Sequence, residues 1–324
     1  MALIRVFSRD NGSGLARDLQ LVEQVLLAAG HDVEAVGFGN EKGINTIRRH
    51  GLRVARLWRG RADVQVFVER ILPDLLPLGG RNLLLPNPEW FPGPWRALLP
   101  RFDAVLCKTR HAVDIFAALG CDARYVGFTS TDQLDAAIPR ERAFFHLAGR
   151  SDAKGTAVLL DAWRRHPEWP RLTVVQSPRR VEAPVTAPNI DHRVARIDEA
   201  GLRALHNRHA FHACPSEMEG FGHSLMEAMS VGAALIATDG APMNELVTRE
   251  RGWLVAPVRV ARRDLAQRHL VDVAGLEAAV ARALACGDAE LAAKQQASRA
   301  YFVQADADFR RALPDAVLGR DGVP

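Results

Sequence analysis

Two carboxylates and two cations in the second half of the chain stand out because glycines and turns surround them. Glu219 and Glu227 are separated by seven residues, and the glycine-containing segment Gly220–Gly222 lies between them. Arg150 and Lys154 lie in a separate turn at the end of an apolar segment. Fixed cations stabilise the negative charge of a departing phosphate group, and an arginine can bind phosphate through two hydrogen bonds. These residue types therefore predict a site for a polar, phosphate-bearing ligand.

The segment around the two glutamates predicts a strand, a loop and a helix. Ala210–Cys214 is a short apolar run that predicts a buried strand. The helix that follows ends at Gly232 and has an inward face formed by Leu225, Met226 and Met229. A glycine loop that leads into a helix gathers unpaired N–H groups at the positive end of the helix dipole, which favours phosphate binding.

Each of these residues also has a purely structural explanation. Glu227 follows Ser224 by three residues and could complete a capping box at the start of the helix. Glu219 could be a solvated loop acid, His223 a surface histidine, and the Arg150–Lys154 pair two solvated loop cations. The combination favours a binding site, because a loop that needs only to turn does not require all of these residues.

The first residues of the chain predict the opening of a doubly wound parallel sheet. Ala2–Ser8 is an apolar strand, a helix ends at Gly30, and His31–Phe38 is a second strand. The turn between the first strand and the helix contains Gly12, Ser13 and Gly14 and is a candidate phosphate contact. It lacks the third glycine of a dinucleotide-binding fingerprint.

A proline-rich segment interrupts the strands that follow. Residues 86–95 contain four prolines and three large aromatic residues, and they come directly after an apolar strand. This segment predicts either a ligand-binding loop at the carboxyl end of a strand or a packed surface loop. The strands and the helix expected nearby are Val64–Val68, Asn82–Leu85, Ala104–Cys107, Arg124–Val126 and the helix Arg110–Leu119.

The polar stretch Thr129–Arg142 predicts a linker, after which the strand and helix pattern restarts. Further strands are expected at Ala143–Ala148, Leu172–Gln176, Ile190–Val194 and Ala234–Ala237. From about Leu276 to about Ala316 the sequence is helical and rich in alanine. The pattern indicates two similar α/β sheets in succession.

Three motifs of the second half resemble the retaining GT-B glycosyltransferases, a large family that transfers sugars from sugar nucleotides. The segment around Glu219 and Glu227 reads PSEMEGFG and EAMSVG, which is similar to the family pattern PSxxEGFGxxxxEAMAxG and its E-x7-E signature. The turn with Arg150 and Lys154 is similar to GRxxxxKG, with three residues between the cations instead of four. Residues 236–245 resemble a third family segment, with Ala241-Pro242 where glycine is more usual.

The resemblance implies a role for each matched residue. Arg150 and Lys154 would bind the diphosphate of the donor, and Glu219 would contact the hydroxyls of its sugar. Glu227 would hold the ribose hydroxyls. The remaining donor contacts would come from the first-half turn over the diphosphate and from the loop before the helix, at Gly12, Ser13, Gly14, Gly220, Phe221, Gly222 and His223. Many members also place a histidine in the first domain near the transferred sugar, and here Asn87 or Glu89 occupies the corresponding location.

The implied fold is GT-B, with two doubly wound, Rossmann-like domains that face a central cleft. The first domain is expected at residues 1–140, on the acceptor side, and the nucleotide-sugar domain at residues 141–296. A final helix, at about residues 297–318, is expected to cross back to the first domain. Its apolar stripe needs a surface to cover, so Phe302 and Phe309 are predicted to contact residues numbered below about 140.

The expected activity is transfer of a hexose-type sugar from a nucleoside diphosphate sugar to a glycan, lipid or other acceptor, with retention of configuration. No cofactor and no metal ion are expected, because the cations of the turn would supply the positive charge. Two alternatives remain open. One is a GT-B epimerase or hydrolase acting on a sugar nucleotide. The other is a degenerate glycosyltransferase that serves as a binding scaffold.

The overall composition limits the kinds of binding partner and the cellular compartment that we expect. The formal net charge of +4 is too small and too dispersed to predict a nucleic-acid partner. The four cysteines form no CxxC pair, which predicts neither disulfides nor zinc and favours the cytoplasm. The first residues resemble a strand instead of a signal peptide, and no apolar run approaches the roughly 20 residues that span a bilayer. Peripheral contact with the inner face of a membrane stays open as an alternative location.

Overall fold

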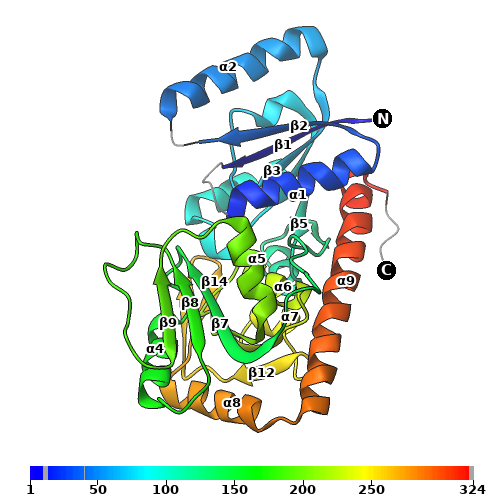
Figure 1. Cartoon of the computed structure of the whole chain (residues 1–324). Helices are drawn as coiled ribbons and strands as arrows, with labels where there is room; N and C mark the ends of the chain where they lie inside the picture. Colours follow the sequence, from blue (N-terminus) through cyan, green and yellow to red (C-terminus); the bar gives the residue numbers. More distant parts are fainter. Residues whose placement is uncertain (10–13, 40, 321–324) are drawn as a thin grey trace. The chain divides into compact units, whose positions relative to one another are not determined.

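The computed structural model describes residues 1–9, 14–39 and 41–320 (Figure 1). The chain forms two compact units. The first consists of Met1–Thr129 together with Ala305–Pro324, and the second of Ser130–Gln304. Each unit is an α/β layer structure built around its own parallel sheet.

The first unit contains a six-stranded parallel sheet in the order β2-β1-β3-β4-β5-β6. The chain places β2 on one side of β1 and then continues with β3 on the other side, so the strand order reverses between β1 and β3. Continuous apolar runs form these strands because helices or loops cover both faces of a parallel sheet. The strands are β1 Leu3–Arg9, β2 Asp32–Phe38, β3 Ala62–Val68, β4 Gly79–Leu85, β5 Ala104–Cys107 and β6 Ala123–Tyr125.

The helices of the first unit connect these strands. The proline-rich connection between β4 and β5 forms two 3-10 helices. Trp90, at the end of the first, is half exposed, and Phe91, which follows it, is buried. The helical elements are α1 Gly14–Ala28, α2 Lys42–Arg59, η1 Leu76–Leu78, η2 Pro88–Trp90, η3 Gly93–Arg101 and α3 Arg110–Ala117.

The second unit repeats this architecture with the order β12-β11-β10-β7-β8-β9. Here the order reverses between β7 and β10, which are neighbouring parallel strands. The ring of Phe144 on β7 stacks on Phe211 of β10 at 4.7 Å between centroids, and Trp163 packs edge-on against Phe144 at 5.0 Å. The strands are β7 Glu141–Gly149, β8 Leu172–Gln176, β9 Ile190–Val194, β10 His209–Cys214, β11 Ala234–Thr238 and β12 Gly252–Val255.

The helices of the second unit pack on this sheet, and a separate antiparallel hairpin follows β12. The sequence patterns above predict neither this hairpin, formed by β13 and β14, nor α2 of the first unit. The hairpin strands are β13 Arg259–Arg263 and β14 Ala266–Leu270. The helices are α4 Thr156–Arg165, α5 Glu199–Arg208, α6 His223–Ser230, α7 Met243–Leu246, α8 Val273–Ala285 and α9 Asp288–Leu318.

The last helix, α9, begins in the second unit and ends in the first. Phe309 lies 4.7 Å from Phe128 between ring centroids, which confirms its predicted packing on the first unit. Phe302 is buried and belongs to the second unit, which begins at Ser130. Its contact with residues numbered below about 140 stays a prediction.

The first unit ends at Thr129, about ten residues before the boundary at residue 140 that the sequence suggests. Polar contacts attach the predicted linker to the second unit. The amide of Gln133 donates to Ser230 Oγ at 3.1 Å, and the amide of Asp135 donates to Asn207 Oδ1 at 2.9 Å. The backbone amides of the predicted linker donate both hydrogen bonds, so its main chain is held in place by side chains of the second unit.

Candidate functional site

The predicted site residues of the second half gather where the strand order of the second sheet reverses. Arg150 and Lys154 follow the carboxyl end of β7, and Glu219 follows the carboxyl end of the adjacent strand β10. Ligands of open parallel sheets bind at the carboxyl ends of the strands, at the point where the order reverses. The topology therefore puts these loops where a ligand site is expected.

The two loops are held against each other by a close backbone contact. The amide of Glu217 donates to the carbonyl of Ala153 at 2.8 Å. Gly155 has φ +66°, and a Cβ atom there would lie 2.3 Å from the carbonyl oxygen of Pro215. Only glycine fits this position, because a side chain would be strained by the backbone and would also collide with the neighbouring loop. Because Gly155 directly follows Lys154, this contact also fixes the position of Lys154.

A buried histidine ties the same two strands to α4. His146 on β7 donates from Nδ1 to the carbonyl of Ala213 at 2.7 Å, and its Nε2 accepts from the hydroxyl of Thr156 at 2.9 Å. Burial lowers the pKa of His146 to about 4, so the ring is neutral at physiological pH. The ring therefore acts as an uncharged crosslink under the site.

Lys154, Glu219 and Ser224 form the centre of the site. The ammonium of Lys154 contacts the carboxylate of Glu219 directly and lies 3.0 Å from Ser224 Oγ. Burial alone would lower the pKa of Lys154, but the charge and hydrogen bond of Glu219 outweigh it, so the pKa lies above its ordinary value. With 16% and 12% of their side-chain surfaces exposed, the lysine and glutamate remain accessible to a ligand.

The helix α6 starts at the loop that carries Glu219. Its N-cap is Gly222, which has φ +110° and no side chain to cap the first N–H groups. The capping-box explanation for Glu227 is therefore wrong, because Ser224 lies inside the helix and its hydroxyl contacts Lys154. The uncapped start of α6, close to a lysine, is the type of site that binds an anion.

Glu227 lies deeper than the sequence suggested. Only 3% of its side chain is exposed, and its carboxylate is 3.7 Å from Nε2 of His206. His209 and His212, which follow at a spacing of three, are buried, and burial lowers the pKa of both. Within the described ranges, no group of three or more histidine, cysteine, aspartate or glutamate residues could hold a metal ion.

The remaining predicted residues lie around this centre. His223 hydrogen-bonds through Nδ1 to Ser130 Oγ at 2.6 Å, and its ring packs edge-on against Phe221. Arg150 is exposed, and its carbonyl accepts from Arg180 at 2.8 Å. In the first unit, Gly14 begins α1, whereas the predicted residues Gly12 and Ser13 lie outside the described residues.

A second polar cluster lies in the first unit, and the sequence pointed only to its residue Asn87. It consists of Asp18, Glu69, Asn87 and Lys108, which come from α1 and from the segments after β3, β4 and β5. Lys108 Nζ lies 2.5 Å from Asp18 Oδ2 and 3.0 Å from Asn87 Oδ1, and Asn87 Nδ2 lies 3.4 Å from Glu69 Oε2. We call these four residues the first-unit cluster.

Two further features mark the first-unit cluster as a functional candidate. Glu69 has φ +64°, an uncommon and strained conformation for a residue other than glycine. Burial raises its pKa above the ordinary value, although Lys108 acts in the opposite direction. Among the described residues the cluster joins three neighbouring strand ends, so only the fold brings it together. The signal in the sequence was a polar residue one or two positions after each apolar strand.

Comparisons with known proteins agree with this geometry. Residues 143–271 match the family described as glycosyl transferases group 1. The chain is 25% identical, over 325 residues, to the lipopolysaccharide core biosynthesis mannosyltransferase LpsB of Rhizobium meliloti strain 1021, covering 88% of this chain and 92% of LpsB. In the described part of the chain, no helix has both the length and the apolar content needed to cross a membrane.

Two solved structures illustrate the shared fold. A glycosyltransferase from Rickettsia africae ESF-5 has a TM-score of 0.73 at 13% identity, and the match covers 98% of both chains. Anabaena HepE in complex with UDP-glucose has a TM-score of 0.68 at 12% identity, and the match covers 99% of both chains. The two parallel six-stranded sheets are those of the GT-B fold.

Proposed function

We propose that this chain, a glycosyltransferase with the GT-B fold, transfers a hexose from a nucleoside diphosphate sugar to a hydroxyl of a glycan or lipid-linked acceptor, with retention of configuration and without a metal ion. The observation that carries the proposal is the accessible Lys154–Glu219 pair beside the uncapped start of α6. The names of two similar proteins support it. LpsB is named a mannosyltransferase, and HepE was solved with UDP-glucose.

The donor would bind across the reversal point of the second sheet. In the ligand-free protein, Glu219 neutralises the ammonium of Lys154. A diphosphate would compete for that ammonium, with Arg150 as a second cation, and would leave the Glu219 carboxylate to accept hydrogen bonds from the sugar. Gly220–Gly222 would bring backbone N–H groups close to sugar and phosphate, and Glu227 would bind the ribose hydroxyls.

The proposed chemistry is an exchange of one bond at the anomeric carbon. The bond between that carbon and the diphosphate oxygen breaks, and a bond to the acceptor oxygen forms on the same face. The acceptor proton passes to the departing diphosphate. Lys154 stabilises the negative charge that develops on the leaving group, and preorganised electrostatic stabilisation of this kind is often the largest contribution to catalysis.

The first-unit cluster would serve the acceptor. Carboxylates and amides at strand ends are suited to hold sugar hydroxyls. Burial raises the pKa of Glu69, so this carboxyl group keeps a proton more readily than an exposed glutamate and is the member of the cluster suited to exchange a proton with an acceptor hydroxyl. The cysteines of the described chain are unpaired thiols, which fits a cytoplasmic enzyme.

Release of nucleoside diphosphate from a panel of sugar nucleotides, with and without acceptor extract, tests the proposal. Lys154→Ala should lower turnover about a hundredfold, the loss typical of one transition-state donor. Lys294→Ala is a matched control, because this lysine of α9 has 12% of its side chain exposed and donates a hydrogen bond to the carbonyl of Arg249. Near wild-type turnover by Lys154→Ala would contradict the assignment.

The same assay separates the alternative functions. Release that does not depend on acceptor would indicate a hydrolase, and nucleotide binding without turnover would indicate a scaffold. Turnover should persist in excess chelator, because Lys154 and Arg150 supply the charge. Loss of turnover that magnesium or manganese restores would contradict the metal-independent mechanism.

A further inference from the structure

The helix α2, Lys42–Arg59, has an unusual surface. None of its described residues is buried, although it is 18 residues long. Its outward side carries five large apolar residues with exposures between 42% and 87%, namely Ile44, Ile47, Val54, Leu57 and Trp58. A surface helix normally turns its apolar stripe toward the core. Here much of the apolar surface points to solvent.

The charge of α2 is as one-sided as its apolar surface. The helix contains five arginines and one lysine and no aspartate or glutamate, so its formal charge is +6. Arg49 and Arg53 pair with Asp74 at 3.2 and 3.1 Å, and Arg56 is exposed. The helix therefore combines an exposed apolar stripe with arginines on the rest of its circumference.

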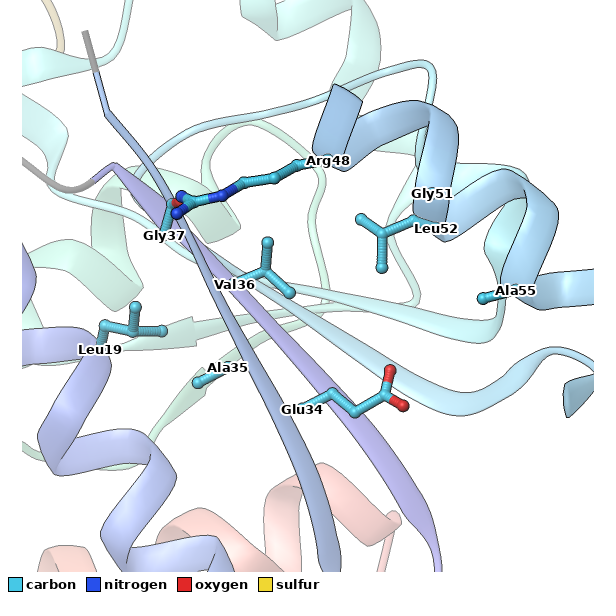
Figure 2. Close-up of a pocket in the computed structure, with 9 residues that line it drawn as sticks. All are labelled: Leu19, Glu34, Ala35, Val36, Gly37, Arg48, Gly51, Leu52 and Ala55. Atoms are coloured by element: carbon cyan, nitrogen blue, oxygen red, sulfur yellow. The ribbon is translucent and has the colours of Figure 1, made fainter. Parts of the chain in front are cut away.

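Hydrogen bonds attach the inner side of α2 to the edge of the first sheet. Arg48 donates to the carbonyl of Gly37, and Asn45 donates to that of Gly39 at 2.8 Å. Figure 2 shows Leu52 and Ala55 of the helix facing Val36 of the edge strand β2 across a hollow of about 570 Å³. Polar contacts therefore fix the direction of the helix, while its five exposed apolar residues remain accessible to a binding partner.

We propose that α2 docks the first unit on a lipid bilayer that contains anionic headgroups. An amphipathic helix with basic borders and exposed Trp, Leu and Ile lies in the plane of the membrane interface, with its apolar side chains among the acyl chains. Arginines can place their stems along the apolar surface and their charged ends at the phosphates. Trp58, the most exposed of the five apolar residues, suits the interfacial region.

Charge complementarity selects this partner over a second copy of the chain. In a symmetric dimer through α2, the same surface would face itself, and two helices of charge +6 would repel each other. An anionic lipid surface attracts the exposed arginines of the helix. The docking does not rest on the transfer activity, because α2 contains none of the residues assigned to donor or acceptor.

Cosedimentation with vesicles tests the proposal on the full chain. The wild type should bind phosphatidylcholine vesicles that contain phosphatidylglycerol, bind pure phosphatidylcholine much more weakly, and be released by high salt. The triple variant Ile47→Ser/Leu57→Ser/Trp58→Ser should bind the anionic vesicles at least about tenfold more weakly than the wild type. A matched control is Val258→Ser/Val260→Ser/Val303→Ser, which removes three apolar residues of 50–64% exposure from the second unit and should bind normally.

A charge variant tests the electrostatic part separately. Arg56→Glu should weaken binding and flatten its salt dependence, whereas Arg164→Glu on α4, also at an exposed position, should change neither. Glu219→Gln should bind vesicles like the wild type, so a failed transfer proposal would leave this result unchanged. Equal binding to neutral and anionic vesicles, or equal binding by the Ile47/Leu57/Trp58 variant, would overturn the proposal. A dimer that only the Ile47/Leu57/Trp58 variant loses, without vesicle binding, would overturn it as well.

Discussion

The reversal points of the two sheets share a topology and differ in what occupies them. In the second unit, an accessible Lys154–Glu219 pair lies in loops that a neutral histidine and a close glycine contact hold in place. In the first unit, the corresponding region holds the buried Lys108–Asp18 pair, with side-chain exposures of 1% and 3%. The same fold can therefore present a charged pair to a ligand or enclose it within the protein.

This difference indicates a division of roles. An accessible ion pair can exchange its partner for a diphosphate at little cost to the fold, because solvent and ligand both reach it. A buried pair is costly to break, since removal of one member leaves an uncompensated charge in the interior. We expect the second-unit pair to govern turnover and the first-unit pair to govern stability. The predictions below test that comparison, from the largest expected effect to the smallest.

Breaking the buried pair should have the largest effect. Lys108→Met removes the cation that contacts the buried carboxylate of Asp18 and should lower the free energy of unfolding by about 3–5 kcal/mol. Asp18→Asn/Lys108→Met should cost less than the sum of the single variants, because the double variant removes both charges of the pair. Urea unfolding measures both quantities. A cost below about 1 kcal/mol for Lys108→Met would mean that this pair does not stabilise the first unit.

Acid should weaken the second unit through His146. The folded-state pKa is lowered from 6.5 to about 4, so the neutral ring stabilises the fold fully above pH 6.5. This contribution to stability is lost between pH 6.5 and 4, because the unfolded state binds a proton on the ring at a higher pH than the folded state does. The total loss is about 3 kcal/mol, at about 1.36 kcal/mol per pKa unit. In urea unfolding, His146→Asn should have a lower free energy of unfolding at pH 7 than the wild type. Its free energy of unfolding should also fall less on acidification. The exposed His50→Asn should keep the wild-type slope, and an unchanged slope in His146→Asn would contradict this account.

The glycine contact between the two loops should have a smaller, more local effect. Gly155→Ala places a Cβ atom against the carbonyl of Pro215 and forces a non-glycine residue into a left-handed conformation, which costs about 1–3 kcal/mol. Turnover should fall about tenfold as well, because a shift of about 1 Å in Lys154 misaligns the leaving-group contact. Gly287→Ala, where an added Cβ meets nothing within 4 Å, is the control. Normal turnover by Gly155→Ala would show that the loop tolerates this shift.

The sequence singled out the residues of the second-unit candidate site because they lie in two short segments with strong local patterns. Glu219 and Glu227 flank a glycine loop on one strand–helix unit, and Lys154 lies in one turn. Their contact could be inferred once both segments were placed at strand ends. The burial of Glu227 against His206 could not, because it depends on how α6 packs on the sheet.

The first-unit cluster could not be predicted in the same way. Asp18, Glu69, Asn87 and Lys108 are spread over 90 residues, and each is one polar residue beside an apolar strand or within a helix. Their proximity follows from the strand order, which brings β3, β4 and β5 side by side. The surface of α2 was also missed, because the sequence patterns singled out no helix at residues 42–59, and a local pattern does not show whether another element covers a helix.

Calorimetric titration with UDP, GDP and ADP tests the central claim, that the Lys154–Glu219 pair forms the diphosphate site. Lys154→Ala should weaken binding of the preferred nucleotide about tenfold or more, because one charge-assisted contact is lost. Lys294→Ala should not change it. Glu219→Gln should bind that nucleotide at least as tightly as the wild type, since the carboxylate no longer competes for the ammonium, while sugar transfer slows. Wild-type affinity in Lys154→Ala, or loss of nucleotide binding in Glu219→Gln, would contradict the claim.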